Sequence, residues 1–355
     1  MHKIFSMIFI VIFFITFSFF EGEEYYDFHK DKKETLGFEE NNNKLQSDFQ
    51  LDDIQDISDI SFYKTPDTSL LTQIINEIHA AQSRIYLETY ILTEKKIQNA
   101  LIQAQNRGID IQILLEKNPY KAYNINNKAF KKLVEAGIQV HWSDTEDYSL
   151  NHSKFLIIDD IFYISTGNYS YSTFKYNRDF FIRSENSKLL DIILQIFSHD
   201  YNGDKKQFYH PNIVLSPFNS RDHFENLFHT AEHEILLYFQ YFKDDLLVEQ
   251  LIQKQKEGVK VKAIIPESAL KNNIKTLKKL DTAGVSLHIM KKHKMHAKAI
   301  LIDKKYLFIG SINFSTYSLD QNRELGILIK NKKIIDFFIQ SFQDDKAKNT
   351  VKNIF

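Results

Sequence analysis

Two copies of one short pattern are the residues of this chain best suited to chemistry. In each copy a histidine stands two positions before a lysine, and four apolar residues then lead to an aspartate. The copies are His152, Lys154 and Asp159 in the first, and His296, Lys298 and Asp303 in the second. One such string could arise by chance on a surface strand, but two copies about 145 positions apart indicate a duplicated site.

The similarity continues beyond each aspartate. A turn of small residues with an asparagine comes next, and each copy closes on Asn-Arg followed by an acid. These segments are Thr166-Gly167-Asn168 and Asn177-Arg178-Asp179 in the first copy, and Gly310-Ser311-Ile312-Asn313 and Asn322-Arg323-Glu324 in the second. The first asparagine lies one residue nearer to its aspartate than the second does.

These residue types suit the cleavage of a phosphodiester. In an extended segment, positions two apart point to the same face, so each histidine projects beside its lysine. Histidine has an unperturbed pKa of about 6.5, so one neutral imidazole can attack phosphorus while a protonated one donates to the leaving oxygen. The amides and ammonium groups that could hold the non-bridging oxygens belong to Lys154, Asn168, Lys298 and Asn313.

The four acids are expected to have two different roles. Asp179 and Glu324 follow their histidines by about 28 residues, on strands expected to return beside the His-x-Lys strands. There a carboxylate would accept a hydrogen bond from one ring nitrogen and fix the tautomer. Asp159 and Asp303 stand at apparent hairpin turns, so we expect them to be structural and to make no contact with substrate.

The periodicity around the motifs predicts an α/β unit that occurs twice. Strands are expected over residues 84–90, 109–115 and 138–142, alternating with helices around 70–78, over 94–106 and through 133. Residues 228–238 resemble 78–88, which indicates an internal duplication. We therefore expect two duplicated α/β units, 61–210 and 211–355. Each should have a mixed, mostly parallel sheet flanked by helices, with one shared active site at their interface.

The N-terminal residues predict export. A basic start precedes residues 4–20, which carry no charge, and three glutamates follow within four positions. Residues 1–20 therefore form either a signal peptide or a membrane anchor, and the charge asymmetry favours export of the remainder. The product would be secreted, periplasmic or anchored to the extracytoplasmic face of a membrane. Residues 21–60 are acidic and without sustained periodicity, which indicates a flexible tether.

The motifs resemble those of the phospholipase D superfamily, whose signature is His-x-Lys-x4-Asp twice per active site. The resemblance covers the chain from about residue 61 to the C-terminus. It implies a metal-independent, two-step mechanism through a phosphohistidine, without a cofactor, in which His152 is the nucleophile and His296 the general acid and base. We expect a phospholipase D-like phosphodiesterase or phosphatidyltransferase that acts on phospholipid at a membrane surface, because the hydrophobic N-terminus and the tether would keep the catalytic part near lipid. The motif spacing is similar to the cardiolipin synthase branch, which usually carries two N-terminal membrane helices where this chain has at most one.

Three alternatives stay open at this stage. The chain could be an exported, metal-independent endonuclease, since lysines are frequent over residues 254–298, although the net charge of -1 gives no global basic field. It could also be a non-catalytic lipid-binding scaffold. The sequence gives no sign of an obligate protein partner. Metal binding by His293 and His296 is disfavoured, because acidic partners at ligand spacing are missing nearby and Lys298 would repel a cation. The absence of cysteine excludes thiolate chemistry.

Overall fold

The computed structural model describes residues 50–143, 148–204 and 208–349. The expected signal peptide or anchor, residues 1–20, and the greater part of the expected tether lie outside the described residues. Within these three ranges, no helix combines the length and the apolar character needed to cross a bilayer.

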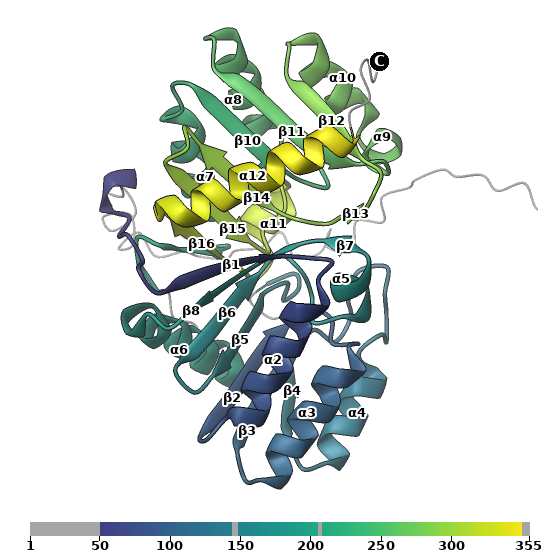
Figure 1. The fold of residues 1–355 in the computed structure, drawn as a ribbon. Coiled ribbons are helices and arrows are strands. Elements are labelled where there is room, and N and C mark those ends of the chain that lie inside the picture. The colour runs from purple at the N-terminus through teal and green to yellow at the C-terminus, as the bar shows by residue number, and fades with distance from the viewer. Residues whose placement is uncertain (1–49, 144–147, 205–207, 350–355) are drawn as a thin grey trace, which may run out of the picture. The chain divides into compact units, whose positions relative to one another are not determined.

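The first half folds as the α/β unit that the periodicity predicts (Figure 1). Each helix and strand expected between residues 70 and 142 is present, and the strands begin or end within one residue of the predicted bounds. Its elements are β1 (Ile60–Lys64), α2 (Thr68–Ala80), β2 (Arg84–Thr89), α3 (Lys95–Asn106), β3 (Asp110–Leu115), α4 (Asn127–Glu135), β4 (Gln139–Trp142), β5 (Lys154–Ile158), β6 (Ile161–Ser165), α5 (Tyr171–Lys175), β7 (Asn177–Arg178), β8 (Phe180–Ser184) and α6 (Ser187–Asn202).

The second half repeats the order of the main strands and helices, apart from one added short helix and the place of a two-residue strand, which confirms the internal duplication. Its elements are β9 (Ile213–Ser216), α7 (Ser220–His229), β10 (Glu234–Tyr238), α8 (Asp245–Lys256), β11 (Lys260–Pro266), α9 (Ala269–Asn272), α10 (Ile274–Thr282), β12 (Ser286–Met290), β13 (Lys294–Met295), β14 (Ala299–Ile302), β15 (Tyr306–Gly310), α11 (Thr316–Asp320), β16 (Glu324–Ile329) and α12 (Lys332–Asn349).

Each half contains a seven-stranded mixed sheet, in the order β1-β8-β6-β5-β2-β3-β4 in the first and β12-β11-β10-β14-β15-β16-β9 in the second. The expectation of mostly parallel sheets is wrong. In the first sheet β2–β3 and β3–β4 are parallel, whereas β1–β8, β8–β6, β6–β5 and β5–β2 are antiparallel. The second sheet has the same division. The reason is that each His-x-Lys strand, β5 or β14, pairs antiparallel with β2 or β10 and then continues into a short hairpin.

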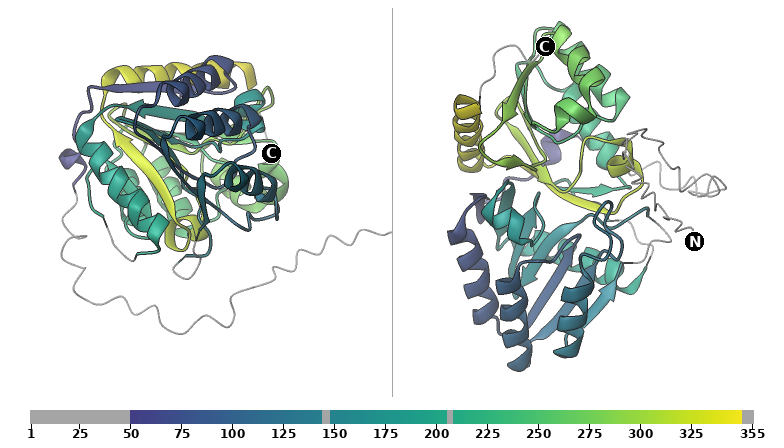
Figure 2. Two further views of the ribbon diagram at one scale, coloured as in Figure 1. Left: turned by 90° about the horizontal axis from the view of Figure 1, so that it is seen from below. Right: turned by 90° about the vertical axis from the view of Figure 1, so that its right-hand side faces the viewer.

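The two halves share a hydrophobic core. Side chains of β5 and β6 pack in one cluster with side chains of β14, β15 and the closing helix α12. The ring of Phe180 meets the rings of Tyr238 and Phe338 edge-on, with centroids 5.0 and 5.6 Å apart. Figures 1 and 2 show α12 covering the second sheet, with β1 of the first sheet beside it. The shared core fixes one half against the other, which a site built from both halves requires.

The expectation of a flexible tether over residues 21–60 is wrong for residues 50–60, the part of it that the structure describes. Residues Leu51–Asp53 form a short 3-10 helix, and the Leu51 and Ile54 side chains are buried in the core of the second half. Ile57 is buried in the shared core, and residue 60 already begins β1, which pairs with β8. This segment therefore runs along the second half before it joins the first sheet.

Candidate active site

The two motif histidines are each held by a carboxylate from the opposite half. His152 Nδ1 lies 2.8 Å from Glu324 Oε2, and His296 Nδ1 lies 2.8 Å from Asp179 Oδ1. Both carboxylates are fully buried. The expected role of the two acids as ring partners therefore has a matching geometry, and the pairing crosses the interface between the halves.

Backbone pairing explains why the contact crosses. His152 donates its N–H to the carbonyl of Arg323 at 2.7 Å, and His296 donates to the carbonyl of Arg178 at 3.1 Å. The residues before each His-x-Lys strand thus run beside the Asn-Arg segment of the other half, and β13 pairs with β7 in the same way. The prediction that each acid returns beside its own His-x-Lys strand is wrong, because β6 separates β5 from β8 and β15 separates β14 from β16.

The arginines of the two Asn-Arg segments stabilise the packing of the two halves that brings each acid to the histidine of the other half. Arg178 donates to both carboxylate oxygens of Asp345 on α12, at 2.7 and 2.8 Å. Arg323 donates to Asp200 on α6 at 2.8 Å. All four side chains are buried, so each arginine joins its own half to the closing helix of the other.

The two motif lysines are buried and lie near each other. Lys154 and Lys298 are at most 1% exposed, and each donates to the carbonyl of its own motif histidine. Burial lowers the pKa of Lys298 to about 8, against the pull of Asp179 and Glu324. Burial and the charge of Lys298 hold the pKa of Lys154 well below its usual range. Two cations that influence each other from opposite halves mark a site prepared for an anion.

The electrostatics favour neutral imidazoles in the ligand-free site. Burial lowers the pKa of His152 to about 4, although Glu324 opposes the shift, and burial lowers the pKa of His296 against Asp179. Burial disfavours the charged form of the two acids as well, but the facing histidines hold their pKa values below the usual range. Each ionised acid therefore selects the tautomer with its proton on Nδ1, which makes Nε2 the nucleophilic nitrogen.

Asn168 and Asn313 occupy equivalent places at the ends of the hairpins. The one-residue difference in spacing lies in the turn between the hairpin strands, which spans residues 159–160 in the first half and 303–305 in the second. In the part of the chain that the structure describes, the Oδ1 atom of each asparagine is buried without a hydrogen-bond partner. A buried amide with spare bonding capacity is able to bind a ligand at both positions.

Asp159 and Asp303 act on the backbone, as the sequence predicts. Both stand in the hairpin turns with positive φ, 49° and 50°. Asp159 accepts hydrogen bonds from the N–H groups of residues 82–84 at 2.8 to 3.0 Å, and Asp303 accepts from those of residues 232–234 at 2.7 to 2.8 Å. Each aspartate ties its hairpin to the start of the neighbouring antiparallel strand, β2 in the first half and β10 in the second.

Tyr90, which follows β2, borders the site. Its ring meets the ring of His152 edge-on at 4.6 Å and lies 5.1 Å from the ammonium of Lys154. Sequence reasoning missed Asn151, which donates to Glu88 and receives a hydrogen bond from the Ser153 N–H. The signal available was the polar residue directly before the motif histidine, together with an acid near the end of the strand expected at 84–90.

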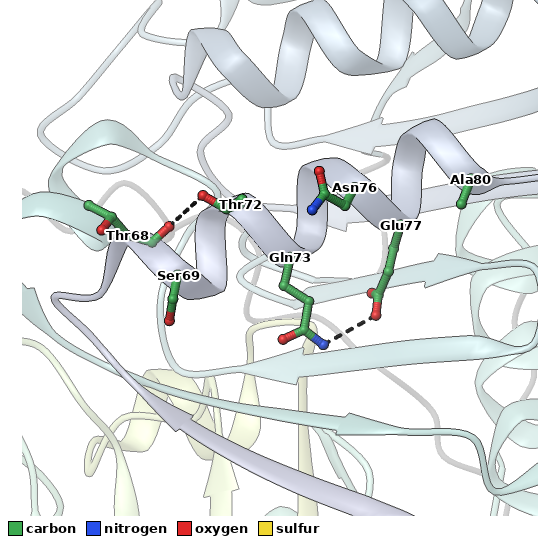
Figure 3. Close-up of a pocket in the computed structure, with 7 residues that line it drawn as sticks. All are labelled: Thr68, Ser69, Thr72, Gln73, Asn76, Glu77 and Ala80. Carbon is green, nitrogen blue, oxygen red and sulfur yellow. Dashed lines mark hydrogen bonds between the residues drawn. The ribbon is translucent and has the colours of Figure 1, made fainter.

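A broad surface hollow lies away from these residues. It runs along one polar face of α2, from Thr68 to Ala80, and Figure 3 shows its lining side chains on that one helix. Gln73 there donates to Glu77 at 3.2 Å. The hollow contains none of the motif residues and is not the place where the chemistry suggested by the motifs occurs.

Comparison with known proteins agrees with this geometry. The sequence matches the family described as cardiolipin synthase, PLD-like domain, over residues 74–201 and again over 224–346. The chain belongs to this family. It is a phospholipase D-like enzyme, a phosphodiesterase of that type, and each of the two matched segments contains one His-x-Lys motif.

Similar proteins come from several bacteria. Cardiolipin synthase B of Salmonella typhimurium is 24% identical over 319 residues, which cover 77% of this chain and 76% of the relative. A phospholipase D of Rickettsia bellii is 33% identical over 121 residues, covering 34% of this chain and 60% of the relative. The phosphatidylserine synthase structure from Haemophilus influenzae aligns with a TM-score of 0.71 at 13% identity, over 87% of this chain and 90% of the other. At that identity the structural likeness shows the shared phospholipase D fold.

Proposed function

We propose that this phospholipase D-like enzyme cleaves the phosphodiester of a phospholipid and transfers the phosphatidyl group to water or an alcohol through a phosphohistidine on His152. The observation that carries the proposal is the crossed pair of His–carboxylate contacts, His152 with Glu324 and His296 with Asp179. A site that needs both halves, with one oriented imidazole from each, matches a two-step displacement with a nucleophile and a separate proton donor.

In the first step, Nε2 of neutral His152 forms a bond to phosphorus, and the bond from phosphorus to the leaving oxygen breaks. The bound phosphodiester anion raises the pKa of both imidazoles, so His296 can carry a proton and deliver it to that oxygen. Lys154 and Lys298, with the amides of the two motif asparagines, bind the non-bridging oxygens, where charge accumulates.

In the second step, neutral His296 removes a proton from water or an alcohol as its oxygen attacks phosphorus. The phosphorus–nitrogen bond breaks, and His152 returns to its neutral state. Glu324 and Asp179 accept the Nδ1–H bonds throughout, and so they stabilise each imidazolium when it forms. The cycle uses the chain's own side chains for both proton transfers.

The lipid substrate is supported by what the similar proteins are named. Cardiolipin synthase B, phospholipase D and phosphatidylserine synthase are names of phospholipid enzymes. We further propose that residues 1–20 direct export, as a cleaved signal or a retained anchor, and that the enzyme works at the extracytoplasmic face of a membrane. The apolar run over residues 4–20 supports this placement.

The test is a product analysis in the presence of EDTA. Vesicles of phosphatidylglycerol, vesicles of phosphatidylcholine and single-stranded DNA are offered separately, with and without glycerol as the acceptor. We expect cleavage of phospholipid, and a transfer product when glycerol is present. Cleavage of DNA alone would replace the proposal with the nuclease alternative, and no cleavage together with lipid binding would favour the scaffold.

The covalent intermediate is tested with substrate labelled in the phosphatidyl phosphate. Acid-labile label is expected on the wild-type chain, and none on His152→Ala. Label on His152→Ala at the wild-type level would overturn the assignment of the nucleophile.

A further inference from the structure

An exposed aromatic loop stands next to the catalytic residues of the first half. We call residues 117–125, between β3 and α4, the tyrosine loop. Tyr120 and Tyr123 are 63% and 66% exposed, and Ile125 is 40% exposed. Lys117 and Lys121 are also exposed, and the segment Lys-Asn-Pro-Tyr-Lys-Ala-Tyr-Asn-Ile contains no acidic residue. The loop thus combines uncovered apolar surface with positive charge.

The base of the tyrosine loop is fixed to the scaffold. The side chain of buried Asn126 donates to the carbonyls of Tyr90 and Glu116, both at 2.8 Å, and accepts from the N–H of Leu92 at 3.0 Å. Inside the loop, Ala122 N–H donates to the Pro119 carbonyl at 2.9 Å. The exposed rings are therefore held outward by an ordered turn.

One hydrogen bond places the loop at the rim of the active site. The Tyr120 N–H donates to the hydroxyl of Tyr90, whose ring touches the ring of His152. The loop is also near Tyr241, because burial raises the pKa of Tyr241 and the Lys121 ammonium opposes that rise. Tyr241 follows β10 in the second half, so the tyrosine loop lies where the two halves meet.

We propose that the tyrosine loop docks the enzyme on the surface of an anionic phospholipid bilayer. This inference rests on the proposed lipid substrate and extends it to the partner surface. Tyrosine places its ring at the boundary of headgroups and acyl chains with its hydroxyl in water, and an exposed isoleucine gains when it leaves water there. Lysines beside these rings are attracted to the negative surface of an anionic leaflet.

The direction of docking follows from the contacts. The backbone N–H of Tyr120 is hydrogen-bonded to Tyr90, which packs on His152. A bilayer that covers the loop therefore lies beside the part of the active site that contains His152. The headgroup phosphates of the covered leaflet then lie on the side of the protein where the loop meets Tyr90 and His152. Single-stranded nucleic acid could stack on the two rings but would gain nothing from Ile125, so the lipid surface is the better fit.

The chain contains no cysteine, which permits a single fluorescent label on the full chain. Tyr123→Cys carries an environment-sensitive dye, and Tyr209→Cys is the matched control at an exposed tyrosine before β9. Phosphatidylglycerol vesicles should shift the emission at position 123 to the blue and leave position 209 unchanged. Phosphatidylcholine vesicles should give a smaller shift at 123. An aqueous spectrum at 123 with anionic vesicles overturns the proposal, as does a shift with single-stranded DNA alone.

A second variant separates docking from the integrity of the site. Tyr120→Ser with Tyr123→Ser should lower the turnover of vesicle lipid by about tenfold, because apolar contact with the bilayer is lost. It should leave cleavage of soluble bis(4-nitrophenyl) phosphate unchanged, since the Tyr120 backbone bond to Tyr90 remains. Equal loss on both substrates would make the loop structural and overturn the proposal. A blue shift without any lipid cleavage would refute the proposed function and support docking, whereas lipid cleavage with no shift would refute docking alone.

Discussion

The two halves place equivalent catalytic groups in unequal surroundings. The His152 side chain is 10% exposed and its ring packs against Tyr90, whereas the His296 side chain is 17% exposed and lies within 3.3 Å of the Lys298 ammonium. The carboxylate contact is 2.8 Å in both. The groups that would face the phosphate are thus repeated, while the residues that support them have diverged.

A second difference lies behind the motifs. Glu88 on β2 corresponds to Tyr238 on β10, and each neighbours the aspartate of a crossed Arg–Asp pair. Burial and the charge of Asp200 raise the pKa of Glu88 well above its usual range, which favours its protonated form. A carboxyl group and a phenol therefore occupy corresponding places beside Asp200 and Asp345. Different side chains can thus meet the aspartate of a crossed Arg–Asp pair in the two halves.

The asymmetry suggests a division of labour. A more enclosed, neutral imidazole suits attack on phosphorus, and a more accessible one suits proton exchange with the incoming acceptor. This favours His152 as the nucleophile and His296 as the acid and base, the same order that resemblance to the superfamily implies. The following predictions test where the two halves are equivalent and where they are not.

The largest effect is expected from the histidines themselves. His152→Ala and His296→Ala should each lower kcat/KM on phospholipid at least about a thousandfold, because the two groups act as one unit. The two variants should differ on a substrate with a good leaving group, when the burst of released leaving group in the first turnover is measured by rapid quench. His296→Ala should still release a burst of leaving group and retain label, whereas His152→Ala should do neither. Bursts of equal size in the two variants would remove the proposed asymmetry.

The crossed carboxylates come next. Glu324→Gln should act on His152 of the other half and lower kcat about a hundredfold or more, because an amide no longer selects the Nδ1–H tautomer. Asp179→Asn should do the same to His296. The nitrogen-15 shifts of the two imidazoles report the tautomers, and each substitution should change only the ring across the interface. A change in the ring of the same half would contradict the crossed arrangement.

Much of this architecture could be predicted from sequence because it is encoded locally. Helical and strand periods within about 15 residues define the elements from 70 to 142, and the repeat of the motif defines the duplication. The structural role of Asp159 and Asp303 also followed from local signals, since each ends an apolar run at a turn. The identity of the motif residues predicted which side chains would gather at the interface.

The crossing of Asp179 and Glu324 could not be predicted, because it depends on how the halves pack. Each acid is nearer in sequence to the histidine of its own half, which made that histidine the expected partner. Within each half, however, one strand, β6 or β15, separates the acid from that histidine. The packing of residues 51–57 was missed for a similar reason. Their acidic neighbours suggested a tether, whereas burial of Leu51 and Ile54 depends on a core formed more than 150 residues later.

A smaller effect should distinguish Tyr90 from Tyr241. Tyr90→Leu removes the ring that packs on His152 and the hydroxyl that receives the Tyr120 N–H, so we expect kcat to fall about tenfold through misplacement of the imidazole. Tyr241→Leu is the matched change after β10 and should cost less. Because Tyr90 acts as a positioning residue, Tyr90→Phe should restore most of kcat, since it keeps the ring. The pH profile of kcat/KM should also shift in Tyr90→Leu, where His152 is less enclosed and more easily protonated.

The smallest predicted change is in the alkaline limb of the pH profile. Burial lowers the pKa of Lys298 to about 8, so its ammonium is present below that pH and is lost as the pH rises through it. The value of kcat/KM, which reports the ligand-free enzyme, should therefore fall above about pH 8. The limb in kcat should lie higher, because the bound phosphate anion raises the pKa of both motif lysines. Lys298→Arg keeps its charge and should remove this limb at the cost of a lower rate, since a guanidinium fits the lysine site poorly. If the limb persists in Lys298→Arg, the titrating group is Lys154, whose pKa burial also lowers, and the first half sets the alkaline limit.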